Sequence, residues 1–240
     1  MCKMPRKKPI IGIVGRPDML NDGDAIICVW EKTRRAIVQK GGIPVLILPT
    51  QNIIYEEIRP KDTPRLIETE KEDLKTIVDC CDGLWIPGGY KWYEYDLVIY
   101  QYALKKDIPI LGVCAGMQMM ASMDNQKRDE SIRGNAKNDT KINHHQENQK
   151  YVHNVTITNN TLLKKIVDTD EMQVNSEHNY HVQTTTEFII SAYSEDGLIE
   201  AIELPNKKFV VGTQWHLETM LNYDEYANKI VDAFIESCRN

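Results

Sequence analysis

The stretch that decides the fold is Ile110-Leu111-Gly112-Val113-Cys114-Ala115-Gly116-Met117-Gln118. An apolar run leads into the pattern G-x-C-x-G and then into residues that favour a helix, at 117–123. This is the thiol counterpart of the G-x-S-x-G nucleophile elbow, in which a sharp strand-to-helix turn holds a nucleophile clear of a sheet. The two glycines would let strand and helix approach closely, and the helix dipole would favour the thiolate of Cys114. Taken alone, the pattern is equally compatible with a buried cysteine between two packing glycines.

Similar apolar runs occur throughout the first half of the chain. Runs without polar alternation are typical of strands buried on both faces, as in a parallel sheet. They lie at residues 10–14, 44–48, 83–86 and 108–113. Amphipathic stretches of helical length separate them, at 30–40, 69–80 and 93–106. The alternation predicts right-handed strand–helix–strand units in a parallel sheet.

The second half of the chain has a different pattern. Residues 124–150 are polar, and we expect an exposed excursion from the core there. Short strands separated by turn residues are predicted at 152–158, 172–175, 188–193, 197–204 and 209–212, before a closing helix at 223–238. Because no repeat or linker is visible, we expect residues 1–240 to form a single α/β domain. It would have a mostly parallel central sheet flanked by helices, with additional antiparallel strands in the second half.

The composition is that of an ordinary globular protein. Of the 240 residues, 42% are apolar and 27% are charged, which excludes disorder, collagen and coiled coil for the chain as a whole. A net charge of −6 gives no electrostatic footprint for nucleic acid, and no segment approaches the roughly 20 apolar residues that span a bilayer. The basic residues before the first strand lack the apolar core of a signal peptide. We therefore expect a soluble, cytoplasmic protein without a nucleic-acid or membrane partner.

A thiolate nucleophile needs a base, and the base needs a partner that orients it. His216 and Glu218 follow the predicted strand at 209–212. In an extended stretch, residues two apart point to the same side, so Glu218 can reach the imidazole. Ligands of parallel α/β sheets gather at the carboxyl ends of strands, where Cys114 and His216 are both expected. A lone histidine is usually structural, but this position and the nearby carboxylate favour catalysis.

An acyl-transfer site also needs backbone N–H groups directed at the developing oxyanion. The amide of Ala115, directly after Cys114, is one candidate. Gly88 and Gly89, at the end of the strand predicted at 83–86, could bring a second amide close to a ligand. Taken alone, Pro-Gly-Gly is more often only a turn.

These motifs together resemble the class I glutamine amidotransferase superfamily, and within it the γ-glutamyl-γ-aminobutyrate hydrolase group. The resemblance rests on Pro87-Gly88-Gly89, Gly112-Val113-Cys114-Ala115-Gly116-Met117-Gln118, Val174-Asn175-Ser176-Glu177-His178, Asp196-Gly197-Leu198-Ile199-Glu200-Ala201-Ile202 and Gln214-Trp215-His216-Leu217-Glu218. The motifs occur in the expected order over nearly the whole chain. Their joint occurrence is far more specific than any one of them.

The resemblance implies a flavodoxin-like sheet and a role for each matching residue. Cys114 would be the nucleophile, His216 the general base and acid, and Glu218 the residue that orients His216. The oxyanion-hole amides would belong to Gly89 and Ala115. The substrate-binding residues would be Gly88, Gln118, Ser176 and His178.

The sequence also departs from the pattern of that group. Ala115 stands where Arg is common after the nucleophile, and Leu217 stands where Pro is typical. The glycine-rich stretch expected after the elbow helix is replaced at 121–126, and the usual His-Gln after the first histidine is missing at 175–180. These changes leave the catalytic residues in place, so they bear on the substrate rather than on the reaction.

Three functions are compatible with these observations. The first is a hydrolase of γ-glutamyl amide bonds, acting through a γ-glutamyl thioester on Cys114. The second is a glutaminase subunit that delivers ammonia to a separate synthase partner. The third is a catalytically silent binding module of the same fold, which the complete set of Cys114, His216 and Glu218 disfavours. The expected partner is a small γ-glutamyl substrate, and a homodimer is compatible with the sequence.

Other clusters of chemically active residues carry less weight. His144, His145 and His153 lie in or near the polar stretch without a carboxylate or cysteine at ligand spacing, so we predict no metal site. The turn at 12–15 lacks the third glycine of a dinucleotide fingerprint, and we predict no cofactor. An aromatic cluster follows the Pro-Gly-Gly turn, and such stripes usually pack a helix on a sheet.

Overall fold

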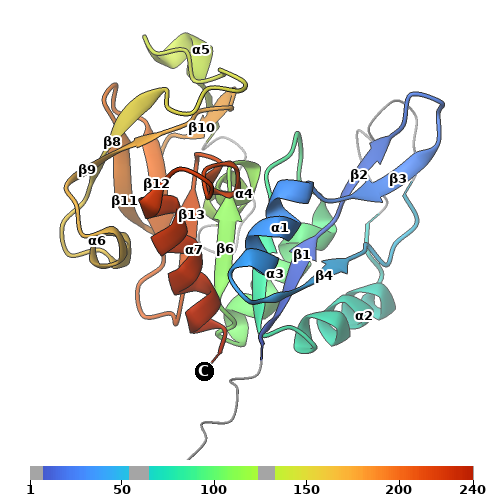
Figure 1. Cartoon of the computed structure of the whole chain (residues 1–240). Helices are drawn as coiled ribbons and strands as arrows, with labels where there is room; N and C mark the ends of the chain where they lie inside the picture. The colour runs from blue at the N-terminus through green and yellow to red at the C-terminus, as the bar shows by residue number, and fades with distance from the viewer. Residues whose placement is uncertain (1–7, 54–64, 124–132, 240) are drawn as a thin grey trace, which may run out of the picture. The chain divides into compact units, whose positions relative to one another are not determined.

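The computed structural model describes residues 8–53, 65–123 and 133–239 (Figure 1). They form two compact units. Unit 1 comprises Met1–Trp85, Tyr93–Ile110 and Val231–Asn240, and unit 2 comprises Ile86–Trp92 and Leu111–Ile230. The prediction that 1–240 is a single domain is not tested by this division and stays a prediction.

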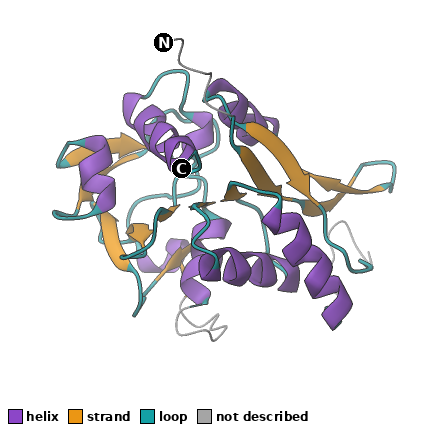
Figure 2. Cartoon of the chain, turned by 90° about the horizontal axis from the view of Figure 1, so that it is seen from below, coloured by secondary structure: helices purple, strands orange, loops and turns teal. Residues whose placement is uncertain are grey.

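Unit 1 contains the parallel strands that the apolar runs predict. Strand β1 (Ile10–Val14) pairs in parallel with β4 (Ile43–Ile47) and with β5 (Gly83–Ile86). The helices α1 (Glu31–Gln39), α2 (Glu68–Asp79) and α3 (Glu94–Lys105) lie within two residues of the predicted bounds. Figure 2 shows helices on both faces of these strands. Continuous burial of β1 and β5 explains why their sequences lack polar alternation.

A hairpin in unit 1 was not predicted. Strands β2 (Arg16–Met19) and β3 (Ala25–Cys28) pair antiparallel around a turn closed by the N–H of Leu20, which donates to Asp24 O at 2.8 Å. No strand was predicted at β2 because its sequence, Arg-Pro-Asp-Met, is mostly polar. Arg16 forms a buried ion pair with Asp96 of α3, and this pairing compensates its charge.

Unit 2 contains most of the antiparallel strands. The strand order is β6 (Ile110–Val113), β13 (Val210–Thr213), β12 (Ile199–Glu203), β11 (Ile189–Ser194), β8 (His153–Ile157) and β9 (Glu171–Val174). The pairs from β13 to β9 are all antiparallel. Helix α4 (Ala115–Ser122) follows β6 and α6 (Leu162–Val167) follows β8. The last helix, α7 (Glu225–Ser237), begins in unit 2 and belongs to unit 1 from Val231 on. The predicted α/β class, with parallel strands and helices first and antiparallel strands in the second half, is confirmed.

The polar stretch at 124–150 is more structured than we expected. Residues 124–132 lie outside the described part of the chain. Beyond them, β7 (Arg133–Asn135) pairs with β10 (Tyr180–Val182), and a short helix α5 (Ala136–Asp139) follows. The expectation of an exposed excursion is wrong for His144, whose side chain is fully buried. The reason is tertiary, because the partners of His144 come from distant segments of the chain.

Within the described residues, no helix is long and apolar enough to cross a membrane.

Candidate active site

Cys114 occupies a strained turn between a strand and a helix. It follows β6 directly and is the N-cap of α4, with φ 51° and ψ −110°. A residue with a side chain rarely adopts this conformation, which costs about 1–3 kcal/mol and is typical of functional turns. Gly116 makes the turn feasible, because a Cβ there would lie 2.1 Å from the carbonyl oxygen of Ile86. The predicted elbow is therefore present, with the helix starting at Ala115 rather than at 117.

The turn lies beside the end of a neighbouring strand. The N–H of Cys114 donates to the carbonyl oxygen of Thr213, the last residue of β13, at 2.7 Å. His216 follows three residues later. A Cβ on Gly88 would lie 2.7 Å from His216 Cε1 and 3.4 Å from Cys114 Cβ. The thiol-bearing residue and the imidazole thus lie against the same glycine, which only a residue without a side chain allows.

His216 and Glu218 form a close pair. The imidazole Nδ1 lies 2.8 Å from Glu218 Oε1, and the two side chains are 14% and 3% exposed. Leu217–Thr219 is a 3₁₀ turn, so the expected extended conformation is wrong although the contact occurs. Burial lowers the pKa of His216, but the negative charges of Glu218 and Cys114 and hydrogen bonds to both outweigh burial. The pKa of His216 is therefore held well above its usual value, which favours an imidazolium beside the thiol.

Asn175 holds the backbone of His216, a role that the sequence did not reveal. Its side-chain amide donates to His216 O at 3.0 Å and to Thr219 Oγ1 at 2.8 Å, and its Oδ1 accepts from the N–H of His216 at 2.9 Å. Asn175 follows β9 and is buried. Its place in the motif at 174–178 was the available signal.

Gln118 projects from α4 into a polar contact with two other segments. Its amide nitrogen donates to Tyr180 O at 2.7 Å and to Gln214 Oε1 at 3.1 Å. The guanidinium of Arg133 lies 4.3 Å from the ring centroid of Tyr180 and 4.6 Å from that of Trp92. Sequence reasoning did not single out Arg133, a cation that lies against the same tyrosine.

The expected oxyanion donors are the backbone amides of Ala115 and Gly89. Ala115 is the first residue of α4, and the first N–H groups of a helix have no intrahelical acceptor. Gly89 follows Gly88, where an added Cβ would meet His216 and Cys114. Their assignment as oxyanion donors stays a prediction.

Ser176 and His178 lie in a different cluster. Ser176 Oγ donates to His144 O at 2.9 Å, and His178 Nδ1 lies 3.0 Å from Tyr180 O. Burial lowers the pKa of His178 to about 3, which keeps this imidazole neutral. Both side chains lie against His144 or Glu200, so their contact with substrate stays a prediction.

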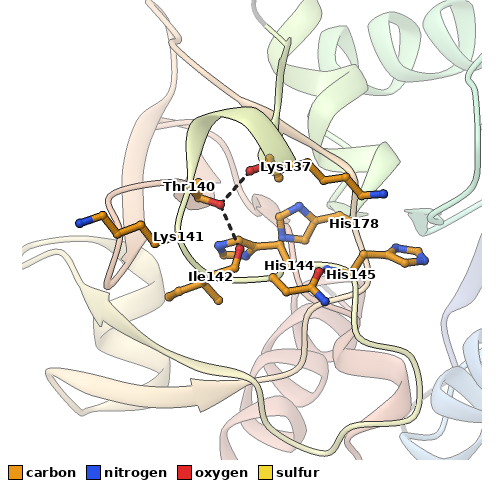
Figure 3. A pocket seen from close by; sticks show the side chains of 9 residues that line it. Lys137, Thr140, Lys141, Ile142, His144, His145 and His178 are labelled. Carbon is orange, nitrogen blue, oxygen red and sulfur yellow. Dashed lines mark hydrogen bonds between the residues drawn. The ribbon is translucent and has the colours of Figure 1, made fainter.

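A pocket of about 340 Å³ opens beside this second cluster (Figure 3). Figure 3 shows His144 and His178 side by side in its wall, with ring centroids 4.9 Å apart. Its lining residues are Ala136, Lys137, Thr140, Lys141, Ile142, Asn143, His144, His145 and His178. Cys114, His216 and Glu218 do not line it. We therefore locate the candidate chemistry by the side-chain contacts at Cys114 rather than by this pocket.

Comparison with known proteins agrees with the motifs. The model of the Peptidase C26 family matches residues 91–218. A glutamine amidotransferase-like protein of Rickettsia prowazekii is 30% identical over 89% of this chain and 92% of its own length. The γ-glutamyl-γ-aminobutyrate hydrolase PuuD of Escherichia coli is 26% identical over 97% of this chain and 94% of its own. In structure, the CTPS glutaminase domain of Trypanosoma brucei matches with a TM-score of 0.61 at 18% identity, covering 94% of both chains, which shows the shared fold.

Proposed function

Since the chain belongs to the Peptidase C26 family, which has the class I glutamine amidotransferase fold, we propose that it is a cysteine-dependent hydrolase of γ-glutamyl amide bonds. The main support for this proposal is the arrangement of three side chains. Cys114 and His216 lie against the same glycine, and Glu218 is hydrogen-bonded to the far nitrogen of the His216 ring. A sulfur, an imidazole and a carboxylate in this order form the set that covalent acyl transfer needs.

The proposed reaction proceeds in two halves. The thiolate of Cys114 attacks the δ-carbonyl carbon of a γ-glutamyl amide, and the tetrahedral oxyanion is held by the N–H groups of Gly89 and Ala115. His216 gives its proton to the departing amine as the C–N bond breaks, leaving a γ-glutamyl thioester. It then takes a proton from water, which attacks the thioester and releases glutamate. Glu218 stabilises the imidazolium in both halves, and each oxyanion donor contributes about 10²–10³ in rate.

The substrate contacts are proposed on the matched motif positions. Gly88 leaves room for the scissile bond beside His216, Gln118 helps to hold the glutamyl group, and Ser176 and His178 are further substrate contacts. Ala115 has a methyl group where the related hydrolases commonly carry Arg. This change removes a cation beside the nucleophile and alters the recognition of the amine portion.

The second candidate function is that of a glutaminase subunit. The structural match to the glutaminase domain of a CTPS favours it, because that domain has the same fold. This chain would then release ammonia from glutamine for a separate synthase.

A substrate comparison tests the proposal. Purified protein is given glutamine and a panel of γ-glutamyl amines, including γ-glutamyl-γ-aminobutyrate, and free glutamate is measured. We expect turnover of at least one γ-glutamyl amine by the isolated chain, and none by Cys114→Ala. The exposed Cys80 offers a matched control, since Cys80→Ala should keep full activity. Turnover of glutamine only with an added synthase would support the second function, and unchanged turnover by Cys114→Ala would refute both.

A further inference from the structure

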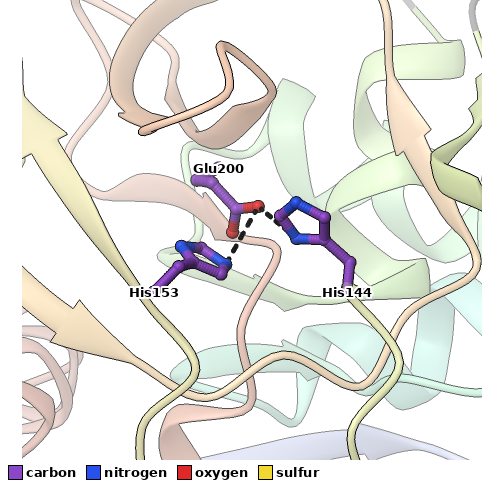
Figure 4. Close-up of side chains that lie close together, drawn as sticks. All are labelled: His144, His153 and Glu200. Carbon is purple, nitrogen blue, oxygen red and sulfur yellow. Dashed lines mark ion pairs between the residues drawn. The ribbon is translucent and has the colours of Figure 1, made fainter. Parts of the chain in front are cut away.

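A buried carboxylate in unit 2 is surrounded by imidazoles. Glu200, the second residue of β12, is fully buried. His178 Nε2, His144 Nδ1 and His153 Nε2 lie 3.5, 3.7 and 3.8 Å from its Oε1. Figure 4 shows His144 and His153 directed at this carboxylate from separate segments. Among the described residues, neither oxygen of Glu200 has a hydrogen-bond partner, and the same holds for Nε2 of His153 and of His178.

The other nitrogen of each ring faces an acceptor. His153 Nδ1 lies 3.1 Å from Asn154 O, and His178 Nδ1 lies 3.0 Å from Tyr180 O. His144 Nε2 lies 3.1 Å from a carboxylate oxygen of Asp196. Because carbonyl and carboxylate oxygens only accept, these nitrogens carry the ring protons. The nitrogens that face Glu200 therefore present lone pairs to it.

Protonation alone cannot give every buried nitrogen and oxygen atom of this cluster a hydrogen-bond partner. A single proton on Glu200 or on His144 could serve one of the three N···O contacts and would leave the other lone pairs opposed among buried side chains. The hydroxyl of Ser176 lies 3.1 Å from His144 Nδ1 and 2.9 Å from His144 O, so its one proton can serve His144 Nδ1 but leaves Glu200 and the Nε2 atoms of His153 and His178 without a partner among the described residues.

We propose that His144 Nδ1, His153 Nε2 and the Glu200 carboxylate bind a divalent transition-metal ion of the zinc type. The three donor atoms lie within 4.8 Å of one another. Zn²⁺ takes imidazole nitrogen and carboxylate oxygen at about 2.0–2.2 Å, so ligands on one ion are separated by about 3–4 Å. Two imidazoles with one carboxylate suit Zn²⁺ or Co²⁺ and not the all-oxygen shells of Mg²⁺ and Ca²⁺. His178 Nε2 lies beside the same carboxylate oxygen as a donor for the fourth position.

The surroundings of the ligands match those of metal sites in proteins. A ligating histidine usually donates its other N–H to a carboxylate or a backbone carbonyl, which fixes the tautomer and the orientation of the ring. Asp196 does this for His144 and Asn154 O does it for His153. Sequence reasoning found no such site because the carboxylate comes from a distant strand.

The ion would fasten the loop of His144 to β8 and β12. That loop is already bonded to the segment after β9, because the N–H of His178 donates to His144 O and the N–H of Gln146 donates to Ser176 O, both at 2.9 Å. Asn175, in the same segment, holds the backbone of His216. The ion would therefore stabilise unit 2, and its binding does not depend on the proposed hydrolase activity.

Metal titration tests this inference without substrate. The full chain, prepared without a histidine tag and stripped with a chelator, is titrated with Co²⁺ and then with Zn²⁺. We expect one Co²⁺ per chain with visible ligand-field bands, displaced by Zn²⁺, and a rise in Tm with metal. Glu200→Gln and His153→Gln should each weaken Zn²⁺ binding about 100-fold or more. His145→Gln is the matched control, because this neighbouring side chain is 39% exposed and pairs with Glu147 instead.

Two results would overturn the proposal. The first is wild-type protein that stays folded but binds no Co²⁺ with ligand-field bands. The second is equal binding by wild type, Glu200→Gln and His153→Gln, which would locate the metal elsewhere. If a ligand variant does not fold, the spectrum of the wild type and its Tm with and without Zn²⁺ still decide the question.

Discussion

Asn175 and His216, which follow different strands of unit 2, are joined by a reciprocal pair of hydrogen bonds. The amide nitrogen of Asn175 donates to His216 O at 3.0 Å, and the N–H of His216 donates to Asn175 Oδ1 at 2.9 Å. The catalytic imidazole that we propose is therefore fixed from both sides, by Asn175 at its backbone and by Glu218 at its ring. Such fixed orientation is what a general base needs.

Asn175→Ala should impair catalysis more than binding. It removes three hydrogen bonds and leaves the N–H of His216 without its acceptor, whereas His216 O keeps the donors of Thr219; each lost bond costs about 1 kcal/mol and the unpaired N–H costs more. We expect a loss of about 2–4 kcal/mol in the free energy of unfolding, measured in urea, and a fall in kcat with little change in KM. The exposed turn residue Asn159 provides the control, since Asn159→Ala should change neither quantity. An unchanged kcat in Asn175→Ala would contradict this positioning role.

Glu218→Gln should move the pH profile of the reaction. Glu218 and Cys114 raise the pKa of His216 above its unfolded value of about 6.5. Charged His216 therefore stabilises the folded protein fully below about pH 6.5, and this contribution to the free energy of unfolding is lost as pH rises through the pKa of His216 in the folded state. Without the charge of Glu218, the alkaline limb of kcat should shift to lower pH, and kcat should fall about 10²–10⁴-fold. Glu225→Gln, at an exposed residue, should leave the limb in place, and a wild-type limb in Glu218→Gln would contradict the assignment.

Strain at the elbow can be measured by exchanging Cys114. Alanine would keep the unfavourable φ and ψ, at about 1–3 kcal/mol, whereas glycine would relieve them and lose only about 0.5–1 kcal/mol in backbone entropy. We expect Cys114→Gly to be more stable than Cys114→Ala by about 1 kcal/mol in chemical unfolding. At Ser122, in the same helix, the order should be reversed, because glycine is the weaker helix former. If the alanine variant is more stable than the glycine variant at Cys114 as well as at Ser122, the turn is not strained.

Gly88→Ala should reduce activity without unfolding the protein. The new methyl group would lie 2.7 Å from His216 Cε1, so the imidazole must move away from Cys114. Displacement of a catalytic group by about 1 Å costs on the order of 10²-fold in kcat. Gly116→Ala provides the contrast, because its methyl group would meet the backbone of Ile86 and should destabilise the fold. Kinetics and thermal unfolding of the two variants distinguish these effects, and full activity in Gly88→Ala would contradict the contact.

Local patterns predicted a large part of the structure. The strand Ile10–Val14 has the predicted bounds because burial on both faces removes polar alternation, and α1 lies within one residue of the predicted range 30–40 at each end. The β2–β3 hairpin was missed because Pro17 and Asp18 break the usual strand composition. His216 and Glu218 could be paired from sequence because they are two residues apart, so local geometry brings them together.

Short runs of sequence predict three features of this protein. These are the order of strands and helices, the elbow at Cys114 and the pairing of His216 with Glu218. Each depends on neighbours within a few residues, where propensity and spacing are enough. The burial of His144, the contact of Gly88 with His216 and the convergence of His153 with Glu200 depend on segments far apart in the chain. Only packing brings such segments together, and packing has no local signature, so tertiary structure decided them.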